Sequence, residues 1–144
     1  MKIYLDNCCF NRPFDDQSQL RIRLEAEAKL QIQDDVRASR YTLVWSYILD
    51  YENSRNPFRE RREQMARWRR HARVDVTADA ALIAQAEQLA SQGFGQLDAL
   101  HLACALRAGA DCFITTDDGI LKKADRVASL RLVDPITFIK LEPS

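Results

Sequence analysis

The sequence predicts an α/β domain built around a mostly parallel β-sheet. Short apolar segments typical of strands alternate with longer amphipathic segments typical of helices, and no repeat or linker separates them. A length of 144 residues fits one domain with its own core, so we expect a single domain over 1–144. With 47% hydrophobic residues, four Gly and four Pro, the composition excludes a disordered or low-complexity chain.

The first strand is predicted at residues 3–5, where a short apolar run ends at a carboxylate, Asp6. An amphipathic helix over 17–38 and a β-branched and aromatic strand over 41–45 follow, and Ser46 is then a suitable helix N-cap. The rest of the chain continues the alternation. Helices are expected over 47–55, 58–70, 78–90, 97–108 and 118–124, and strands over 74–76, 112–115 and 130–133.

The four cysteines predict free thiols rather than a zinc site or a disulfide framework. Cys8 and Cys9 are adjacent, Cys104 and Cys112 lie in apolar segments, and neither pair has metal-ligand spacing. No apolar run approaches the ~20 residues that a membrane helix needs, and Asp6 comes too early for a signal peptide. We therefore expect a cytoplasmic protein with no membrane partner.

Two carboxylates follow predicted strands directly. Asp6 follows the first strand, and Asp117 follows the apolar strand near residue 114. Parallel strands would bring both to the same edge of the sheet, where ligands bind in such folds. Each acid alone is explained by a helix cap or a turn. A carboxylate beside a buried strand otherwise needs compensation, for which a metal ion is suitable.

Glu52 lies on the apolar side of its predicted helix, because residues three and four apart share a face with it. It aligns with Ile48 and Leu49, whereas Asp50 is turned away. An ion pair with Arg55, one turn later, is the alternative explanation for Glu52.

Asp98 opens an otherwise apolar predicted helix that also contains His101. Favourable placement of a negative charge at a helix N-terminus explains Asp98 without a site. His101 shares its face at the i+3 position, so it is either a satisfied core histidine or a contact of the site. Together, several carboxylates at one sheet edge favour a hard divalent cation such as Mg²⁺ or Mn²⁺, which can support phosphodiester hydrolysis.

The order of Asp6, Glu52, Asp98 and Asp117 resembles the acidic quartet of the PIN-domain ribonucleases, which include the toxins of bacterial VapBC-type toxin–antitoxin pairs. The matching stretches are 3–7, 46–52, 97–103 and 114–117. The resemblance implies a three-layer α/β/α PIN-like fold with a central, mostly parallel sheet. It also implies a metal-dependent endoribonuclease with an RNA substrate and an antitoxin partner. We further expect a homodimer.

The resemblance implies a role for each matching residue. Asp6 and Asp98 would be the principal metal ligands, Glu52 would bind the metal or its water, and Asp117 would complete the cluster. Supporting positions are Asn7, Ser46 and Thr115. The family usually has Thr or Ser soon after the first Asp, whereas this chain has Asn7-Cys8-Cys9. Asp118 is the alternative fourth acid, although the Thr-x-Asp spacing favours Asp117.

The net charge of zero conceals a separation of charge. Residues 55–73 hold eight Arg against Glu60 and Glu63, which is 8 − 2 = +6, so the remainder sums to −6. Such a segment can bind phosphates, or it can be a solvated helix face with local ion pairs. The candidate RNA contacts are Arg59, Arg62, Trp68 and Arg69.

Two other functions are compatible with parts of the pattern. One is a catalytically silent PIN-fold module that binds RNA or protein. The other is a phosphatase of the haloacid-dehalogenase type with Asp6 as nucleophile. That type carries a second Asp two residues later, where this chain has Cys8, so we do not favour it.

Overall fold

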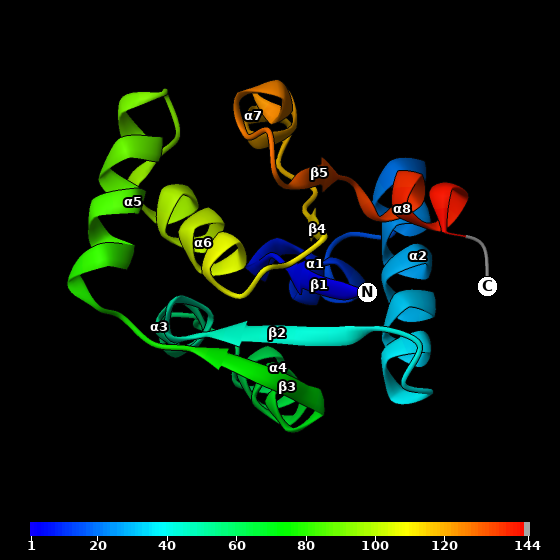
Figure 1. Cartoon of the computed structure of the whole chain (residues 1–144). Helices are drawn as coiled ribbons and strands as arrows, with labels where there is room; N and C mark the ends of the chain where they lie inside the picture. Colours follow the sequence, from blue (N-terminus) through cyan, green and yellow to red (C-terminus); the bar gives the residue numbers. More distant parts are fainter. Residues whose placement is uncertain (143–144) are drawn as a thin grey trace.

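A computed structural model describes residues 1–142 and places a five-stranded, all-parallel sheet at the centre of the molecule (Figure 1). The strand order is β3-β2-β1-β4-β5. The strands are β1 (Lys2–Leu5), β2 (Thr42–Ser46), β3 (Ala72–Val76), β4 (Cys112–Ile114) and β5 (Arg131–Val133). Helices lie on both sides of the sheet, which confirms the predicted α/β/α class.

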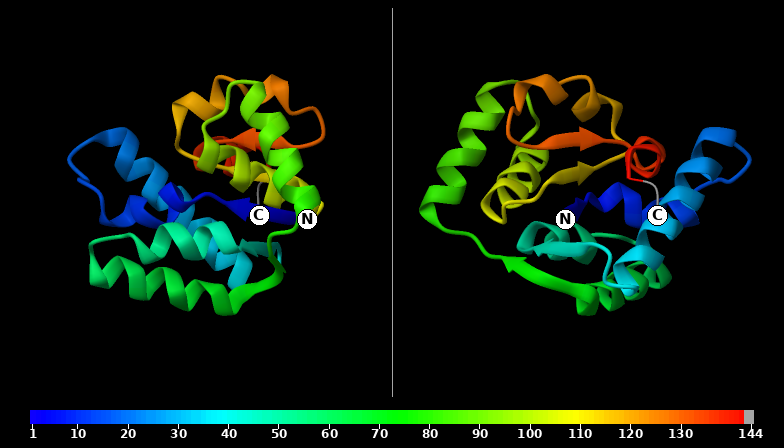
Figure 2. Two further views of the ribbon diagram at one scale, coloured as in Figure 1. Left: turned by 90° about the vertical axis from the view of Figure 1, so that its left-hand side faces the viewer. Right: turned by 45° about the vertical axis from the view of Figure 1, so that its right-hand side comes forward.

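The helices alternate with the strands along the chain. They are α1 (Asn7–Asn11), α2 (Leu20–Arg37), α3 (Tyr47–Ser54), α4 (Arg59–Trp68), α5 (Ala80–Ser91), α6 (Gln96–Arg107), α7 (Asp118–Leu121) and α8 (Pro135–Leu141). Short 3₁₀ turns are η1 (Arg12–Phe14), η2 (Arg69–His71) and η3 (Ala124–Arg126). Helices α5 and α6 lie on one side of the sheet and α2 and α8 on the other (Figure 2). No helix in the described part of the chain is long and apolar enough to cross a membrane.

The central strand β1 is buried on both faces, as expected for a parallel sheet covered by helices. Ile3, Tyr4 and Leu5 are fully inaccessible to solvent. Since all strands run in the same direction, their carboxyl ends meet at one edge of the sheet. Asp6 follows β1 and Thr115 follows β4 at this edge, so the predicted site is located there.

Two helices were not predicted from the sequence. Helix α1 has five residues, too few for a periodic pattern, and begins where the Asp6 side chain accepts a hydrogen bond from the backbone of Asn7. Helix α8 begins at Pro135 after the capping residue Asp134, whose Oδ1 accepts from the Thr137 amide at 2.8 Å. The other elements agree with the prediction to within a few residues. All four cysteines are free thiols, as predicted.

Candidate active site

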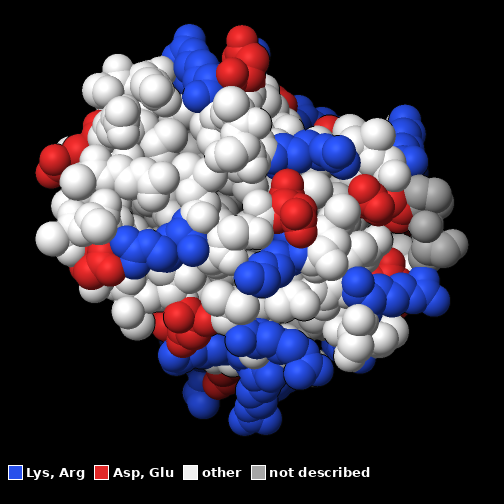
Figure 3. Space-filling view, viewed as in Figure 1, with Lys and Arg blue, Asp and Glu red and all other residues white. Residues whose placement is uncertain are grey.

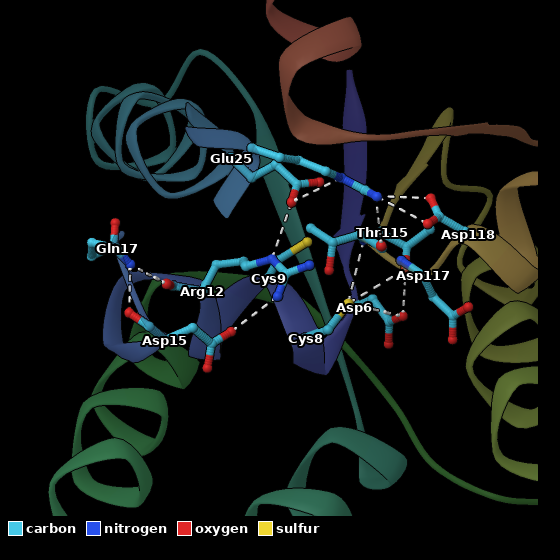
Figure 4. A network of polar contacts seen from close by, with 12 residues as sticks. Asp6, Cys8, Cys9, Arg12, Asp15, Gln17, Glu25, Thr115, Asp117 and Asp118 are labelled. Carbon is cyan, nitrogen blue, oxygen red and sulfur yellow. Dashed lines mark hydrogen bonds and ion pairs between the residues drawn. The ribbon is translucent and has the colours of Figure 1, made fainter. Parts of the chain in front are cut away.

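Asp6 is held at the end of β1 by donors from three directions. Asp6 is 6% exposed, and its carboxylate accepts hydrogen bonds from the Asn7 amide at 2.8 Å and from Thr115 Oγ1 at 2.8 Å. The Cys8 thiol is 3.5 Å from Asp6 Oδ2 and 3.4 Å from Thr115 Oγ1 (Figure 4). Two of the supporting residues expected from the sequence, Asn7 and Thr115, therefore contact Asp6, and the Cys8 thiol adds a third contact.

Glu52 on α3 and His101 on α6 meet beside Asp6. His101 Nε2 hydrogen-bonds to Glu52 Oε1 and lies 3.9 Å from Asp6 Oδ1. Because an ionised carboxylate only accepts hydrogen bonds, Nε2 carries the proton in this contact. Glu52 therefore pairs with His101, and not with Arg55 as the alternative from the sequence required; Arg55 donates to the Tyr51 hydroxyl at 3.3 Å.

His101 is fixed from its other side by a buried chain of hydroxyl groups. The Tyr4 hydroxyl lies 2.5 Å from His101 Nδ1 and 2.6 Å from Ser46 Oγ, and Ser46 also caps α3 by accepting from the Leu49 amide. Burial raises the pKa of Tyr4 well above its usual value, so the phenol stays neutral. Burial lowers the pKa of His101, but the hydrogen bond to Glu52 and the charge of Asp6 outweigh it, so the pKa is raised overall.

Asp98 lies half-buried in the first turn of α6, and the other acids affect its pKa. Desolvation is the largest cause that raises its pKa to about 6, followed by the negative charges of Asp6 and Asp117. Glu52 acts in the same direction, whereas His101 opposes it. Asp98 is therefore subject to the negative charges of the other three predicted carboxylates at this sheet edge.

Asp117 and Asp118 have different partners. Asp117 caps α7 by accepting from the Gly119 amide at 2.8 Å, and its own amide donates to Thr115 Oγ1 at 3.1 Å. Asp118 is exposed and accepts two hydrogen bonds from Arg21, at 2.8 and 2.9 Å (Figure 4). Thr115 therefore links Asp117 to Asp6, while Arg21 neutralises Asp118 outside the cluster.

Comparison with known proteins identifies the family of the chain. The model of the family described as "PIN domain" matches residues 3–127, which cover all four acids. The chain belongs to the PIN-domain family. No curated protein sequence matches it.

Two solved structures share the fold of this PIN domain. VapBC2 from Rickettsia felis, solved bound to a DNA fragment from its promoter, has 15% identity and a TM-score of 0.60 over 92% of this chain and 97% of the other. FitAcB from Neisseria gonorrhoeae has 19% identity and a TM-score of 0.55 with the same coverage. At these identities the similarity shows the fold.

The residues of the PIN domain that could hold a metal ion fit a hard divalent cation. Asp6, Glu52 and His101 each offer a ligand atom within 4.8 Å of the others. His101 Nε2 donates to Glu52, so its lone pair is not free, and the remaining donors are carboxylate oxygens. Oxygen-rich sites suit Mg²⁺ and Mn²⁺, and a cation here would offset the negative charges that, after desolvation, raise the pKa of Asp98.

His101 is the site residue that the sequence left undecided. Both interpretations hold, because the side chain is 1% exposed with both ring nitrogens hydrogen-bonded and also contacts two acids of the cluster. Its i+3 spacing from Asp98 was the available signal. Its link to Tyr4 is a contact across 97 positions of the chain that no local pattern shows.

The arginine-rich segment forms a cationic surface at the lower edge of Figure 3, over α4 and β3. Arg59 is 83% exposed and pairs with Glu63, and Arg69 pairs with Asp75 at 2.8 Å. Arg62 donates to a backbone carbonyl, that of Asn56, at 2.6 Å.

Trp68 does not offer an open ring face to a base. It is 6% exposed, and the Arg37 guanidinium lies 4.6 Å from the centre of its ring. Trp68, one of the candidate RNA contacts, is therefore buried: its ring packs towards α2, and the opposite face of α4 carries the charges.

Proposed function

We propose that this PIN-domain protein is a Mg²⁺- or Mn²⁺-dependent endoribonuclease and the toxin of a toxin–antitoxin pair. The observation that carries the proposal is the electrostatic coupling of Asp6, Glu52, Asp98 and Asp117 at one sheet edge, with the pKa of Asp98 raised to about 6. A carboxylate whose pKa is raised by neighbouring negative charges binds a divalent cation favourably, since the cation removes the repulsion.

Asp6, Asp98 and Asp117 would hold the cation. A bound Mg²⁺ or Mn²⁺ would supply positive charge for phosphate oxygens and would lower the pKa of a water molecule. Glu52 would accept a proton or a hydrogen bond from that water, as a general base does. His101 acts as a positioning residue: it donates to Glu52, and the Tyr4 hydroxyl fixes its ring.

The RNA backbone would follow the cationic surface towards the acids. Arg55 stands next to the site, since it lines a pocket of about 300 Å³ with Tyr51, Glu52 and Leu97. Arg59 and Arg69 extend the charge along α4, and their pairing acids are exposed enough to be exchanged for phosphates. Arg62 would contribute through the same surface, with its guanidinium held by the Asn56 carbonyl just before α4.

The antitoxin and homodimer proposals rest on the fold and on the surface. VapBC2 and FitAcB, which share the fold, support a protein partner for this chain. A second copy of the chain is supported by exposed apolar side chains on α3, α5 and α6, such as Tyr51, Ile83 and Leu97.

Cleavage of a labelled RNA with Mn²⁺ or Mg²⁺ tests the nuclease. We expect Asp6→Asn and Asp98→Asn to lose at least about 100-fold in rate, because each removes a metal ligand. Asp118→Asn is the matched control and should cut within about threefold of the parent, since Asp118 is neutralised by Arg21 outside the cluster. Parent-like rates for the first two variants would refute the assignment. If the parent neither cuts RNA nor binds Mn²⁺ in calorimetry, the catalytically silent module is correct.

A further inference from the structure

A buried lysine without an acidic partner lies outside the acidic cluster. Lys29 of α2 is 4% exposed, and no carboxylate within residues 1–142 lies within ion-pairing distance of it. The acid one turn earlier, Glu25, pairs with Arg12 at 3.1 Å and Arg21 at 3.5 Å instead. Buried charges in proteins are normally paired, so the missing partner requires an explanation.

The surroundings of Lys29 leave its ammonium group uncompensated. Its Nζ lies 5.4 Å from the centre of the Phe10 ring and 6.0 Å from that of the Trp68 ring. Burial is the main cause that lowers its pKa to about 8, and the charge of Arg37 adds to the effect. The Cys9 thiol is nearby, but burial raises its pKa well above the usual value, so it is neutral at pH 7.

Lys29 lines a pocket of about 200 Å³ between α1, η1, α2 and α4. The walls include the rings of Phe10, Phe14 and Trp68, and the polar lining includes Lys29, Gln33 and Arg37. Gln33 is 3% exposed, and its amide nitrogen has no hydrogen-bond partner in the described residues. Two buried donor groups therefore line one recess without acceptors.

We infer that this pocket binds a carboxylate carried on a short apolar stem. A carboxylate has two oxygens and one negative charge, which match one ammonium group and one amide nitrogen. The aromatic walls would cover the stem, and Arg37 adds positive charge at the same recess. The source is either a Glu or Asp side chain of a partner polypeptide or a free organic acid.

Nuclear magnetic resonance of the Lys29 side chain in the full-length chain tests whether the pocket binds a carboxylate. The probes are the peptide acetyl-Ala-Glu-Ala-amide, its Gln counterpart, and butyrate. The Glu peptide or butyrate should shift the Lys29 signals saturably and raise its pKa, whereas the Gln peptide should not. Binding of the peptide at least about tenfold tighter than butyrate assigns a polypeptide partner, and the reverse assigns a free acid.

Three variants separate the site from general effects. Lys29→Met keeps the length of the side chain without its charge and should weaken binding at least about tenfold, as should Gln33→Leu. Lys122→Met, at an exposed lysine, is the matched control and should bind like the parent.

If Lys29→Met does not fold, Gln33→Leu provides the same comparison. Absence of saturable binding to the parent, or unchanged binding by Lys29→Met or Gln33→Leu, would overturn the inference. None of these measurements uses RNA cleavage as a readout, so their outcome is independent of the proposed function.

Discussion

At the scale of single residues, the acids of the site differ from Asp118 in lacking an arginine partner within residues 1–142. Asp6 accepts from the Asn7 amide and from Thr115 Oγ1. By contrast, Asp118 pairs with Arg21. Among the described residues, no Lys or Arg forms an ion pair with Asp6, Glu52, Asp98 or Asp117. The cluster therefore keeps its negative charge available for a cation.

Replacing Asp98 by Asn should stabilise the protein without metal. A carboxyl whose pKa is raised on folding, here from about 3.9 to about 6, destabilises the folded state as the pH rises through that range. Discounted for the half-exposed side chain, Asp98→Asn at pH 7.5 should raise the free energy of unfolding by about 1 kcal/mol. Thermal unfolding in a chelator should show a Tm about 2–4 °C higher.

The same variant should respond less to metal. Mn²⁺ should raise the Tm of the parent by more than it raises the Tm of Asp98→Asn, because the variant lacks one ligand. Below pH 4, where the parent carboxyl is protonated, the stability difference without metal should disappear. An equal response of both proteins to Mn²⁺ would show that Asp98 is not a ligand.

Thr115 should matter through its hydroxyl group. Its Oγ1 donates to Asp6 and accepts from the Asp117 amide, so it sets the relative position of two acids. Thr115→Val removes these bonds without changing the size of the side chain and should weaken Mn²⁺ binding about tenfold, while Thr115→Ser should stay close to the parent. Calorimetric titration compares them. Equal affinities for Val and Ser would mean that the hydroxyl does not position the acids.

Asp6, Glu52, Asp98 and Asp117 could be singled out from the sequence because their placement follows from local rules: the ends of parallel strands and the face of a helix. The contacts of His101 could not, since they join α6 to β1 and α3 through tertiary packing. The choice between Asp117 and Asp118 also needed the position of Arg21, which is 97 residues from Asp118.

At the scale of elements, the predictions were accurate where a segment is long enough to show a period. Helix α2 was expected over 17–38 and spans Leu20–Arg37, and the helix expected over 97–108 is α6, Gln96–Arg107, followed by Gly109 with φ of +69°. Helix α1 was missed because five residues show no period, and α8 because its seven residues are marked by the cap Asp134-Pro135 and not by a long periodic pattern.

The cap of α8 should be measurable. Asp134 accepts from the Thr137 amide at 2.8 Å and from Thr137 Oγ1 at 2.7 Å. Asp134→Ala removes both bonds and should lower the free energy of unfolding by about 1 kcal/mol in urea. Asp125→Ala, at an exposed position in η3, is the control and should change it by less than about 0.5 kcal/mol. Equal effects of the two variants would contradict the capping role.

At the scale of the whole molecule, positive and negative charges are concentrated in different parts of the chain, and exposed apolar side chains lie on helices α3, α5 and α6. The segment 55–73 carries a net +6, and the remainder, which includes the acidic cluster, carries −6. The sequence showed this separation, but not which arginines are free, because that depends on folded partners such as the Asn56 carbonyl for Arg62. The exposed apolar surface could not be predicted from the sequence either, because helical periodicity does not distinguish a face that packs in the core from one that forms an interface.

The exposed apolar face should join two copies of the chain. It contains Ile83 at 39%, Leu97 at 43% and Tyr51 at 46% exposure, on helices α5, α6 and α3. A pocket of about 230 Å³ beside Ile83, between α5 and α6, could receive side chains of a second copy. A stable dimer needs about 800 Å² from each partner, which requires all three helices to take part.

Light scattering after size-exclusion chromatography tests this face. The parent should have the mass of a dimer, and Ile83→Glu should shift it to a monomer, because a charge would be buried without a partner at the interface. Leu20→Glu, at a residue of α2 with 59% exposure, places the same charge on another surface and should remain dimeric. Dissociation by Leu20→Glu but not by Ile83→Glu would move the interface to α2. There it would compete with any partner that reaches the pocket of Lys29, so the dimer on α5 and α6 is the arrangement that leaves that pocket accessible.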